Sequence, residues 1–407
     1  MLLISRATTL SISTLYPHFN FVGFRTLYLT ECEAKLLVGG PVDVGCFMIF
    51  ASYGWDNCSD AQTWNEDLRL AEIAADSGFD VLWSTEHHFC DYSFIPDNLQ
   101  LMTHLAAKYP HIDVGTAAVI LPWHDPLRVA EQVAMLDFLS NGRLRFGMGR
   151  GLARREFEGF RVSMDESRQR FDESAKMIIN ALETGFMESE GPIYKQPRVD
   201  IRPRPQNSMD GRIYSVATSE QSVESVAKLG DIRMVMFADR PWEMRAPVLN
   251  KGKELHQKYH GRPAPTPMLT DFAICAHSND QAEEWARKYQ GMFTESNFYH
   301  YEFLGEHFES VKGYDGYQQK AEFARKTGGD LTGAVDNFMK AASWGTPDRI
   351  LRGLEERRKI VGDFELNVSF RFGGTPMEIA EEGLKLFAKE VIPVLKTWKN
   401  DENDLVN

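Results

Sequence analysis

Short apolar runs alternate along this chain with longer segments whose apolar residues recur at helical spacing. Several of the runs are nearly continuous in apolar residues, which is typical of strands buried on both faces of a sheet. Eight such runs predict strands at residues 42–50, 79–84, 112–121, 143–149, 212–217, 232–237, 268–276 and 364–370.

Each predicted strand is followed by a segment with helical periodicity. In residues 64–77, for example, Trp64, Leu68, Ala71 and Ala75 fall on one face of a helix. Helices are predicted at 64–77, 97–107, 126–139, 165–185, 219–229, 241–260, 279–299 and 376–395. Strands that each precede a helix indicate an α/β fold, a closed (β/α)8 TIM barrel, more than a doubly wound sheet. No Gly-x-Gly-x-x-Gly turn follows the first strand, which weakens a dinucleotide-binding interpretation.

Two stretches are longer than a barrel needs. Residues 187–211 are rich in proline and glycine and predict an inserted hairpin or loop. Residues 300–346, the largest insertion, precede the last strand and carry many Tyr, Phe, Gly and charged residues. An insertion between the seventh and eighth strands should emerge at the catalytic mouth of the barrel and act as a lid. The alternative is a decorative, partly disordered loop.

The ends of the chain differ from the barrel in composition. The first 30 residues contain no acidic residue and many Ser, Thr and aromatic residues, which resembles an organellar transit peptide. We interpret residues 1–41 as a dispensable or disordered N-terminal extension, with a functional targeting signal as the alternative. Residues 42–398 form the predicted barrel domain, and residues 399–407 form a polar C-terminal tail. A cytoplasmic location is expected unless the extension directs the chain to an organelle.

The overall composition is that of an ordinary globular protein, with 43% hydrophobic and 25% charged residues in a chain of 407. A formal charge of −13 argues against a nucleic acid or an anionic membrane as partner. The five cysteines are scattered without a Cys-x-x-Cys pair, which indicates a reducing compartment and neither a zinc site nor a disulfide framework. No window approaches 18 uninterrupted apolar residues, so no membrane span is expected.

The second predicted strand runs directly into the ionisable residues Glu86, His87 and His88. Aromatic residues that would line a pocket for an apolar ligand come next, namely Phe89, Tyr92 and Phe94. Adjacent residues on extended chain point oppositely, so one histidine should be the acid/base group and the other structural. Glu86 could orient either imidazole or contact a cofactor. No His-x-x-x-His or similar spacing supplies a third ligand, so we predict no metal site.

A phosphate site is indicated at two other strand ends. Glycines surround Arg150 after the fourth predicted strand, where a guanidinium can hold a phosphate, although a tight turn with a solvated Arg is the alternative. A predicted helix begins at Ser219 and carries Ser222, and the free N–H groups of a helix start bind anions. Thr218 and Gln221 have capping-box spacing, which is a purely structural explanation. Together, Arg150 and this helix start would suit a phosphorylated cofactor such as FMN.

Small residues end the third predicted strand. Ala117 and Ala118 leave room for a flat ring at the barrel rim, although packing explains them equally well. Trp123 lies just beyond them, near enough to contribute to a pocket wall.

These segments resemble the bacterial luciferase-like, flavin-dependent monooxygenase family, notably the luciferase α subunit. The resemblance spans roughly residues 44–396 and rests on several motifs in the same order. The motifs are Trp83 with Glu86-His87-His88-Phe89, residues 114–119 (Val-Gly-Thr-Ala-Ala-Val), residues 142–152 (Gly-Arg-Leu-Arg-Phe-Gly-Met-Gly-Arg-Gly-Leu), and Met164-Asp165 with Ser167-Arg168.

The resemblance implies a barrel that binds reduced FMN at its mouth. A separate flavin reductase would supply the reduced FMN as a transient donor. The reaction of reduced FMN with molecular oxygen would give a peroxyflavin. This peroxyflavin would oxygenate a small, mostly apolar molecule such as an aldehyde or ketone. His87 corresponds to the catalytic base, Arg150 and Arg168 to phosphate ligands, and the Ala117–Ala118 bond to a position where the family often has a cis peptide. A homodimer or heterodimer is expected.

The resemblance also implies two sets of site residues. The expected cofactor contacts are Glu86, Ala117, Ala118, Gly149, Arg150, Leu152, Arg168, Thr218, Ser219 and Ser222. The expected substrate pocket is formed by His88, Phe89, Tyr92, Phe94, Trp123 and Ala153.

Three residues depart from the family pattern. Gly149 replaces a reactive cysteine beside the flavin, Thr218 replaces an acidic residue at the phosphate site, and Ala153 replaces an aromatic residue. The first change suggests a different flavin environment, and the last suggests a changed substrate pocket. Light emission with a long-chain aldehyde is therefore not expected.

Two other functions remain open. A deazaflavin-dependent dehydrogenase or reductase of the same superfamily would share the barrel but transfer hydride without oxygen, and the luciferase-type motifs favour FMN over it. A non-catalytic flavin-binding accessory subunit is the second, and the presence of both histidines and Arg150 argues against it.

Overall fold

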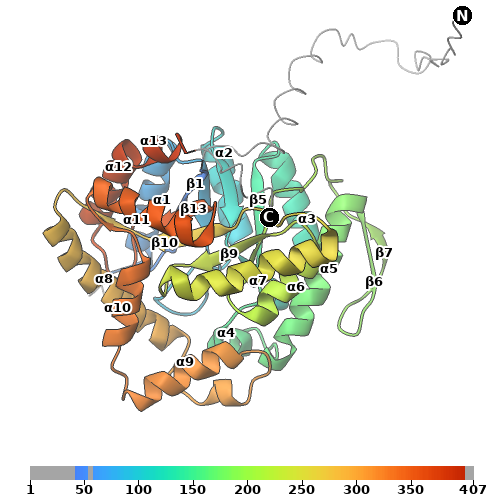
Figure 1. The fold of residues 1–407 in the computed structure, drawn as a ribbon. Helices are drawn as coiled ribbons and strands as arrows, with labels where there is room; N and C mark the ends of the chain where they lie inside the picture. Colours follow the sequence, from blue (N-terminus) through green and yellow to red (C-terminus); the bar gives the residue numbers. More distant parts are fainter. Residues whose placement is uncertain (1–41, 54–57, 399–407) are drawn as a thin grey trace, which may run out of the picture. The chain divides into compact units, whose positions relative to one another are not determined.

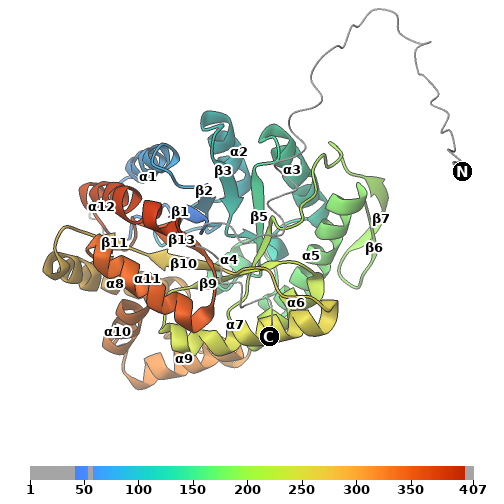
Figure 2. The same ribbon diagram turned by 45° about the horizontal axis from the view of Figure 1, so that its top comes forward.

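The computed structural model describes residues 42–53 and 58–398, and within them eight parallel strands close into a barrel (Figure 1, Figure 2). The strands pair in the order β3-β2-β1-β13-β10-β9-β8-β5, and β3 pairs with β5 to complete the ring. The eight are β1 (Val44–Met48), β2 (Val81–Ser84), β3 (Asp113–Thr116), β5 (Leu144–Gly149), β8 (Ile213–Val216), β9 (Arg233–Phe237), β10 (Met268–Phe272) and β13 (Glu365–Ser369). The predicted TIM barrel is confirmed, and each of these strands lies inside a predicted run. The expected extension (1–41) and tail (399–407) lie outside the described residues.

The helices that cover the strands begin and end on local signals. The Ser59 side chain accepts the backbone N–H of Gln62 at the start of the first helix, and Asp97 and Asp125 cap the next two in the same way. Gly185, in the left-handed conformation, ends a fourth. These helices are α1 (Asp60–Ala75), α2 (Asn98–Lys108), α3 (Pro126–Leu139), α5 (Ser167–Thr184), α6 (Glu220–Leu229), α7 (Trp242–His260) and α12 (Met377–Glu390). None of the described helices is long and apolar enough to cross a membrane.

The seventh covering helix differs from the prediction. The helix predicted at 279–299 exists as α8 (Asn279–His300), but it packs on the insertion that follows it. The barrel is instead covered there by α11 (Pro347–Val361), which packs against α7 and α12 and for which the sequence predicts no helix. Eight of the fifteen residues of α11 are charged, so its buried stripe is too narrow to stand out in the sequence.

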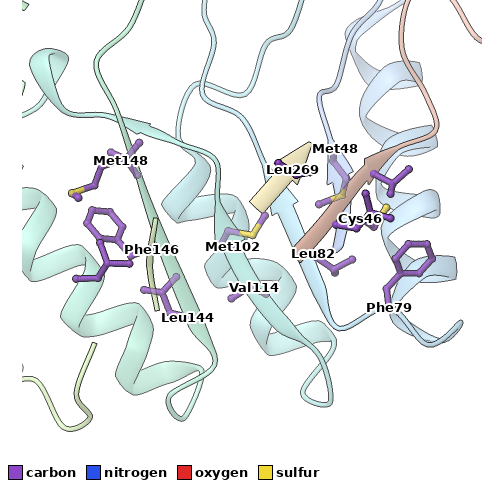
Figure 3. Packing of buried hydrophobic residues seen from close by; sticks show 14 of the residues in the cluster. Cys46, Met48, Phe79, Leu82, Met102, Val114, Leu144, Phe146, Met148 and Leu269 are labelled. Carbon is purple, nitrogen blue, oxygen red and sulfur yellow. The ribbon is translucent and has the colours of Figure 1, made fainter. Parts of the chain in front are cut away.

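Successive strand residues face alternately out of and into the barrel. Cys46 and Met48 of β1 and Leu82 of β2 face outwards, into the apolar layer between strands and helices that Figure 3 shows. Phe47 and Trp83 belong to a second apolar cluster, inside the barrel. The barrel therefore has two cores, one on each side of its wall.

Trp83 fills the barrel interior below the strand ends. A Cβ atom at Gly45 or at Gly115 would lie 2.4 Å from the Trp83 indole, so both neighbouring strands must carry glycine opposite it. The indole also meets the Tyr214 ring edge-on, with ring centroids 4.9 Å apart. The interior is thus a packed floor, which leaves the mouth as the place for a site.

The first insertion forms the predicted hairpin. Its strands β6 (Phe186–Glu190) and β7 (Lys195–Asp200) pair antiparallel and project from the barrel in Figure 1. β6 packs beside α5, which directly precedes it in the chain.

The second insertion is built mainly from helices. It contains α9 (Asp315–Lys326) and α10 (Thr332–Ala341) and ends in β12 (Trp344–Gly345), which pairs in parallel with β11 (Ile274–Cys275). Phe157 of the short helix α4 (Arg154–Gly159), which follows β5, belongs to the same buried apolar cluster as Ala321 and Ala324 of α9. The insertion is therefore a folded cover over one end of the barrel.

Candidate active site at the carboxyl ends of the strands

Glu156 of the short helix α4 contacts three histidines at the mouth of the barrel. His87 and His88 follow β2, and His300 comes from a distant helix. His87 Nδ1 lies 3.1 Å from Glu156 Oε1, and the backbone N–H of His88 donates to the same oxygen at 2.8 Å. His300 Nε2 lies 3.6 Å from Glu156 Oε2. Burial opposes the negative charge, but His87 and His300 outweigh it and lower the pKa of Glu156 to about 2. The carboxylate is therefore charged at neutral pH.

His300 is the last residue of α8 and is fully buried. Its Nδ1 lies 2.9 Å from Cys90 Sγ, and its ring stacks on that of Tyr92 with centroids 4.5 Å apart. Burial lowers the pKa of His300 to about 4, so the imidazole is neutral. Burial also raises the pKa of Tyr92 to about 12, so the phenol keeps its proton.

The sequence predictions missed Glu156 and His300. Glu156 follows the glycine-rich run around Arg150 on the next helix, so its position offered a signal. His300 offered none, because it lies 210 residues from Cys90 along the chain. The atoms of His87, Glu156 and His300 lie within 4.8 Å of one another, a donor set that can also hold a metal ion. Our prediction of no metal site considered only sequence spacing, whereas the fold supplies His300 as a third donor.

A second carboxylate, Glu86, lies behind the first and also binds two histidines. Glu86 Oε1 lies 3.3 Å from His88 Nε2 and 2.6 Å from His124 Nε2, and Oε2 accepts the backbone N–H of Ile120 at 2.8 Å. Despite its burial, the hydrogen bonds from His124 and His88 lower the pKa of Glu86. Burial would lower the pKa of His124, but Glu86 raises it. Glu86 is thus placed to orient His88, which is one of the two roles that the sequence left open.

A cleft of about 320 Å³ opens at this end of the barrel. Its lining residues are Asp60, Trp64, His87, His88, Phe89, Phe94 and Pro96. Four of the predicted site residues are therefore together in one mostly apolar cleft. Trp123 instead packs on His88 and Phe160, and Ala153 is fully buried beside Phe157.

The two predicted phosphate ligands lie under the second insertion. Arg150 donates from Nη1 to the Gly313 carbonyl at 2.8 Å, and its guanidinium lies over the Tyr314 ring at 3.8 Å. Arg168 has a buried Nε and a buried Nη2 without a hydrogen-bond partner. Burial and the nearby charge of Arg150 lower the pKa of Arg168 to about 10. Two guanidinium groups held together, one with unpaired N–H groups, fit an anion.

The start of α6 forms the third part of the predicted phosphate site. Ser219 caps the helix and forms a capping box with Ser222, so the capping interpretation that paired Thr218 with Gln221 is wrong by one residue. Thr218 Oγ1 lies 3.3 Å from the Tyr317 hydroxyl of the insertion. The insertion therefore contacts both the Arg150 side and the α6 side of this region.

The peptide bond between Ala117 and Ala118 is cis, as the resemblance implied. Gly149 lies close to this segment, and a Cβ atom there would come within 2.7 Å of Ile120 Cδ1 and 3.3 Å of Ala118 Cβ. Ile120 thus takes the space that a side chain at position 149 would need. Leu152 is half-buried against the cluster that contains Ala153.

An eight-stranded barrel with a buried carboxylate–histidine cluster and paired arginines at its mouth belongs to the class of TIM-barrel enzymes. The family model described as luciferase-like monooxygenase matches residues 44–363, and the chain belongs to this family. The resemblance seen in the sequence motifs is therefore confirmed.

Two relatives in other organisms are informative. The alkanal monooxygenase alpha chain of Photorhabdus luminescens is 28% identical over 331 residues, which cover 81% of this chain and 91% of that protein. The oxygenase component of the flavin-dependent trigonelline monooxygenase of Acinetobacter baylyi is 28% identical over 233 residues, 56% of this chain and 64% of that protein.

Solved structures share the fold. A monooxygenase from Streptomyces bottropensis superposes with a TM-score of 0.69 at 25% identity, covering 86% of this chain and 99% of that one. The coenzyme F420 dependent tetrahydromethanopterin reductase of Methanopyrus kandleri gives a TM-score of 0.61 at 21% identity, covering 88% of this chain and all of that one. The barrel alone thus occurs with more than one chemistry.

Proposed function

We propose that this protein is a monooxygenase that uses reduced FMN and molecular oxygen to oxygenate a small, mostly apolar molecule such as an aldehyde or ketone. The observation that carries the proposal is Arg168, whose buried Nε and Nη2 lack a partner beside the charge of Arg150. Two neighbouring guanidinium groups suit a terminal phosphate, because a guanidinium can bind a phosphate with two parallel hydrogen bonds. Arg150 and Arg168 would hold the FMN phosphate, with Ser219 and Ser222 at the start of α6.

When bound, reduced FMN supplies the two electrons that let one oxygen atom of dioxygen enter the substrate while the other leaves as water. The protein binds, orients and shields the reactants. His87 would exchange a proton through Nε2, because Nδ1 faces Glu156. Phe89, Phe94 and Trp64 line the cleft and favour an apolar substrate.

The relatives support two further parts of the proposal. The name of the alkanal monooxygenase alpha chain favours an aldehyde as substrate. The trigonelline enzyme is named an oxygenase component, which favours a separate flavin reductase as donor here as well. We also propose a dimer, because three large apolar residues of α3, Met135, Phe138 and Leu139, are each about half exposed.

The test is anaerobic titration of the protein with reduced FMN, followed by rapid mixing with oxygen while the absorbance spectrum is recorded. We expect a transient absorbance distinct from that of free oxidised FMN, which an aldehyde substrate should make decay faster. His87→Ala should bind reduced FMN normally but lower product formation by about 100-fold or more, because general acid–base catalysis contributes about 10²–10⁴-fold. Arg168→Met should weaken FMN binding instead.

Three results would count against the proposal, each in its own way. Normal turnover by His87→Ala would mean that His87 is not the base. Flavin that binds but never consumes oxygen would indicate a non-catalytic flavin-binding subunit. Flavin that simply reoxidises at its rate in buffer would direct the search to coenzyme F420, a deazaflavin, and to hydride transfer.

A further inference from the structure

Four side chains form a continuous line that ends at the cleft, and the two in the middle, His300 and Glu156, are fully buried. Cys90 Sγ lies 2.9 Å from His300 Nδ1, and His300 Nε2 lies 3.6 Å from Glu156 Oε2. The other Glu156 oxygen lies 3.1 Å from His87 Nδ1, and His87 lines the cleft. Both ends of the 3.6 Å step are buried atoms without another hydrogen-bond partner. His300 Nε2 and Glu156 Oε2 therefore face each other at a distance slightly longer than that of an ordinary hydrogen bond.

The protons along this line can be assigned from the charges. His300 is neutral, so only one of its ring nitrogens carries hydrogen. Burial raises the pKa of Cys90, so its thiol keeps a proton and can donate to Nδ1. The N–H of His300 is then on Nε2, directed at the Glu156 carboxylate. That carboxylate accepts only, so His87 must carry its proton on Nδ1 and leave Nε2 as the basic nitrogen.

We propose that Glu156 and His300 are positioning residues for His87. Glu156 fixes the ring orientation and the Nδ1–H tautomer of His87, and His300 holds the Glu156 carboxylate in place from its other oxygen. The proposal goes beyond the proposed function and rests on it only in treating His87 as the base. The tautomer itself exists whether or not flavin is the cofactor.

His300 also ties this arrangement to the second insertion. It ends α8, immediately before the segment that leads to α9. Its ring stacks on Tyr92, whose ring meets the ring of His87 edge-on at 5.1 Å between centroids. A displacement of this end of α8 would remove His300 from both Glu156 and Tyr92. The base is therefore fully oriented only while the start of the insertion is in place.

The direct test is the tautomer of His87 in protein labelled with ¹⁵N-histidine, read from the nitrogen chemical shifts by NMR. We expect Nδ1–H in the wild type. Glu156→Leu should change it to the Nε2–H form that free imidazole favours, and Glu156→Asp should restore part of the Nδ1–H form. The matched control is Glu86→Gln, which alters the other carboxylate and should leave the His87 tautomer unchanged. This measurement needs no flavin and no turnover, so it stands even if the proposed function fails.

The kinetic test separates positioning from a merely structural role. Glu156→Leu should lower kcat by about 100-fold, within the range for general acid–base catalysis, with the Kd for reduced FMN unchanged. His300→Phe keeps the ring stack on Tyr92 but removes the N–H, and we expect a fall in kcat of about 3–10-fold. The control is His256→Phe, since His256 is also buried and lies 2.9 Å from Asp231, which precedes β9 at the opposite end of the strands.

Three outcomes would overturn the proposal. The first is a Glu156→Leu variant that keeps the Nδ1–H tautomer. The second is a His300→Phe variant whose kcat changes no more than that of His256→Phe. The third is one equivalent of zinc in the purified protein that is lost in Glu156→Leu, because Glu156 would then be a metal ligand.

Discussion

The mouth of the barrel contains two buried carboxylates, Glu86 and Glu156, and each of them contacts two imidazoles. The two clusters differ in how far along the chain the partners of the carboxylate lie. The partners of Glu86 are close in the sequence, with Ile120 34 residues away and His124 38 residues away. Glu156 gathers His87 from the loop after β2 and His300 from the end of α8. A cavity of about 20 Å³, roughly room for one water, adjoins Glu86 and His124, whereas the cleft of about 320 Å³ opens at His87.

The two clusters also differ in the charge of the histidine that contacts the carboxylate. The pKa of Glu86 is lowered and that of His124 is raised, so these two groups hold each other charged. His300 beside Glu156 is neutral, with a pKa of about 4. Glu86 is thus paired with His124 and also contacts His88, while Glu156 contacts His87, the proposed base, which lines the cleft. The same residue types therefore lie beside a one-water cavity in one cluster and beside an open cleft in the other, and we propose a catalytic role only for the second.

The largest expected effect is on stability. Glu86→Leu leaves His88, His124 and the Ile120 N–H without their acceptor, and we expect the free energy of unfolding to fall by about 3–5 kcal/mol, as for a broken buried ion pair. Glu156→Leu also removes the acceptor of the His88 N–H and the partner of His300. It should still cost less, about 1–3 kcal/mol, because His300 is neutral and His87 can turn to the cleft and bind water. Urea denaturation of both variants measures the difference. A larger loss for Glu156→Leu would invert the comparison.

The same difference explains what the sequence could predict. Glu86, His87 and His88 stand next to one another at a strand end, and the strands themselves are apolar runs, so local reading places them correctly. The role of Glu86 towards His88 was one of two alternatives, and burial with three partners favours it. The assignment of Arg168 as a phosphate ligand, which remains a proposal, came only from the resemblance, since nothing in its local sequence marks it.

Long-range contacts could not be predicted. His300 reaches Glu156 only because the barrel closes and α8 ends over its mouth, and no periodicity in the sequence encodes that meeting. The same holds for Gly313 and Tyr314 of the insertion, which contact Arg150. The sequence analysis missed helix α11 for a local reason, because most of its residues are charged and few of its positions are buried.

The two clusters should also respond oppositely to pH. His300 has a folded pKa of about 4, below the ordinary value of about 6.5, so the unfolded state binds a proton first as the pH falls. Its neutral form therefore favours folding above pH ~6.5, and up to about 3 kcal/mol of stability is lost between pH ~6.5 and ~4. His124 has a raised folded pKa, so its contribution is complete below pH ~6.5 and is lost as the pH rises through the folded value.

Unfolding free energies of wild type, His300→Gln and His124→Gln between pH 4 and 9 test this contrast. The difference between wild type and His300→Gln should decrease towards acid, and the difference for His124→Gln should decrease towards alkali. The second change should be smaller, because 31% of the His124 side chain is exposed and solvent screens its pair with Glu86. Two curves with the same slope would mean that the clusters do not differ in charge.

The smallest expected effect comes from the insertion, on which only one cluster depends. The Tyr314 hydroxyl lies 3.0 Å from both the Gly151 carbonyl and Ser167 Oγ, and Tyr314→Phe removes these contacts at a cost of about 1 kcal/mol. Hydrogen exchange should become faster around residues 313–317. The ¹⁵N signals of His87 and His300 should shift, because both lie under the insertion, whereas those of His88 and His124 should not. Equal shifts in all four histidines would show that the insertion supports both carboxylates alike and that the Glu86 cluster is not independent of it.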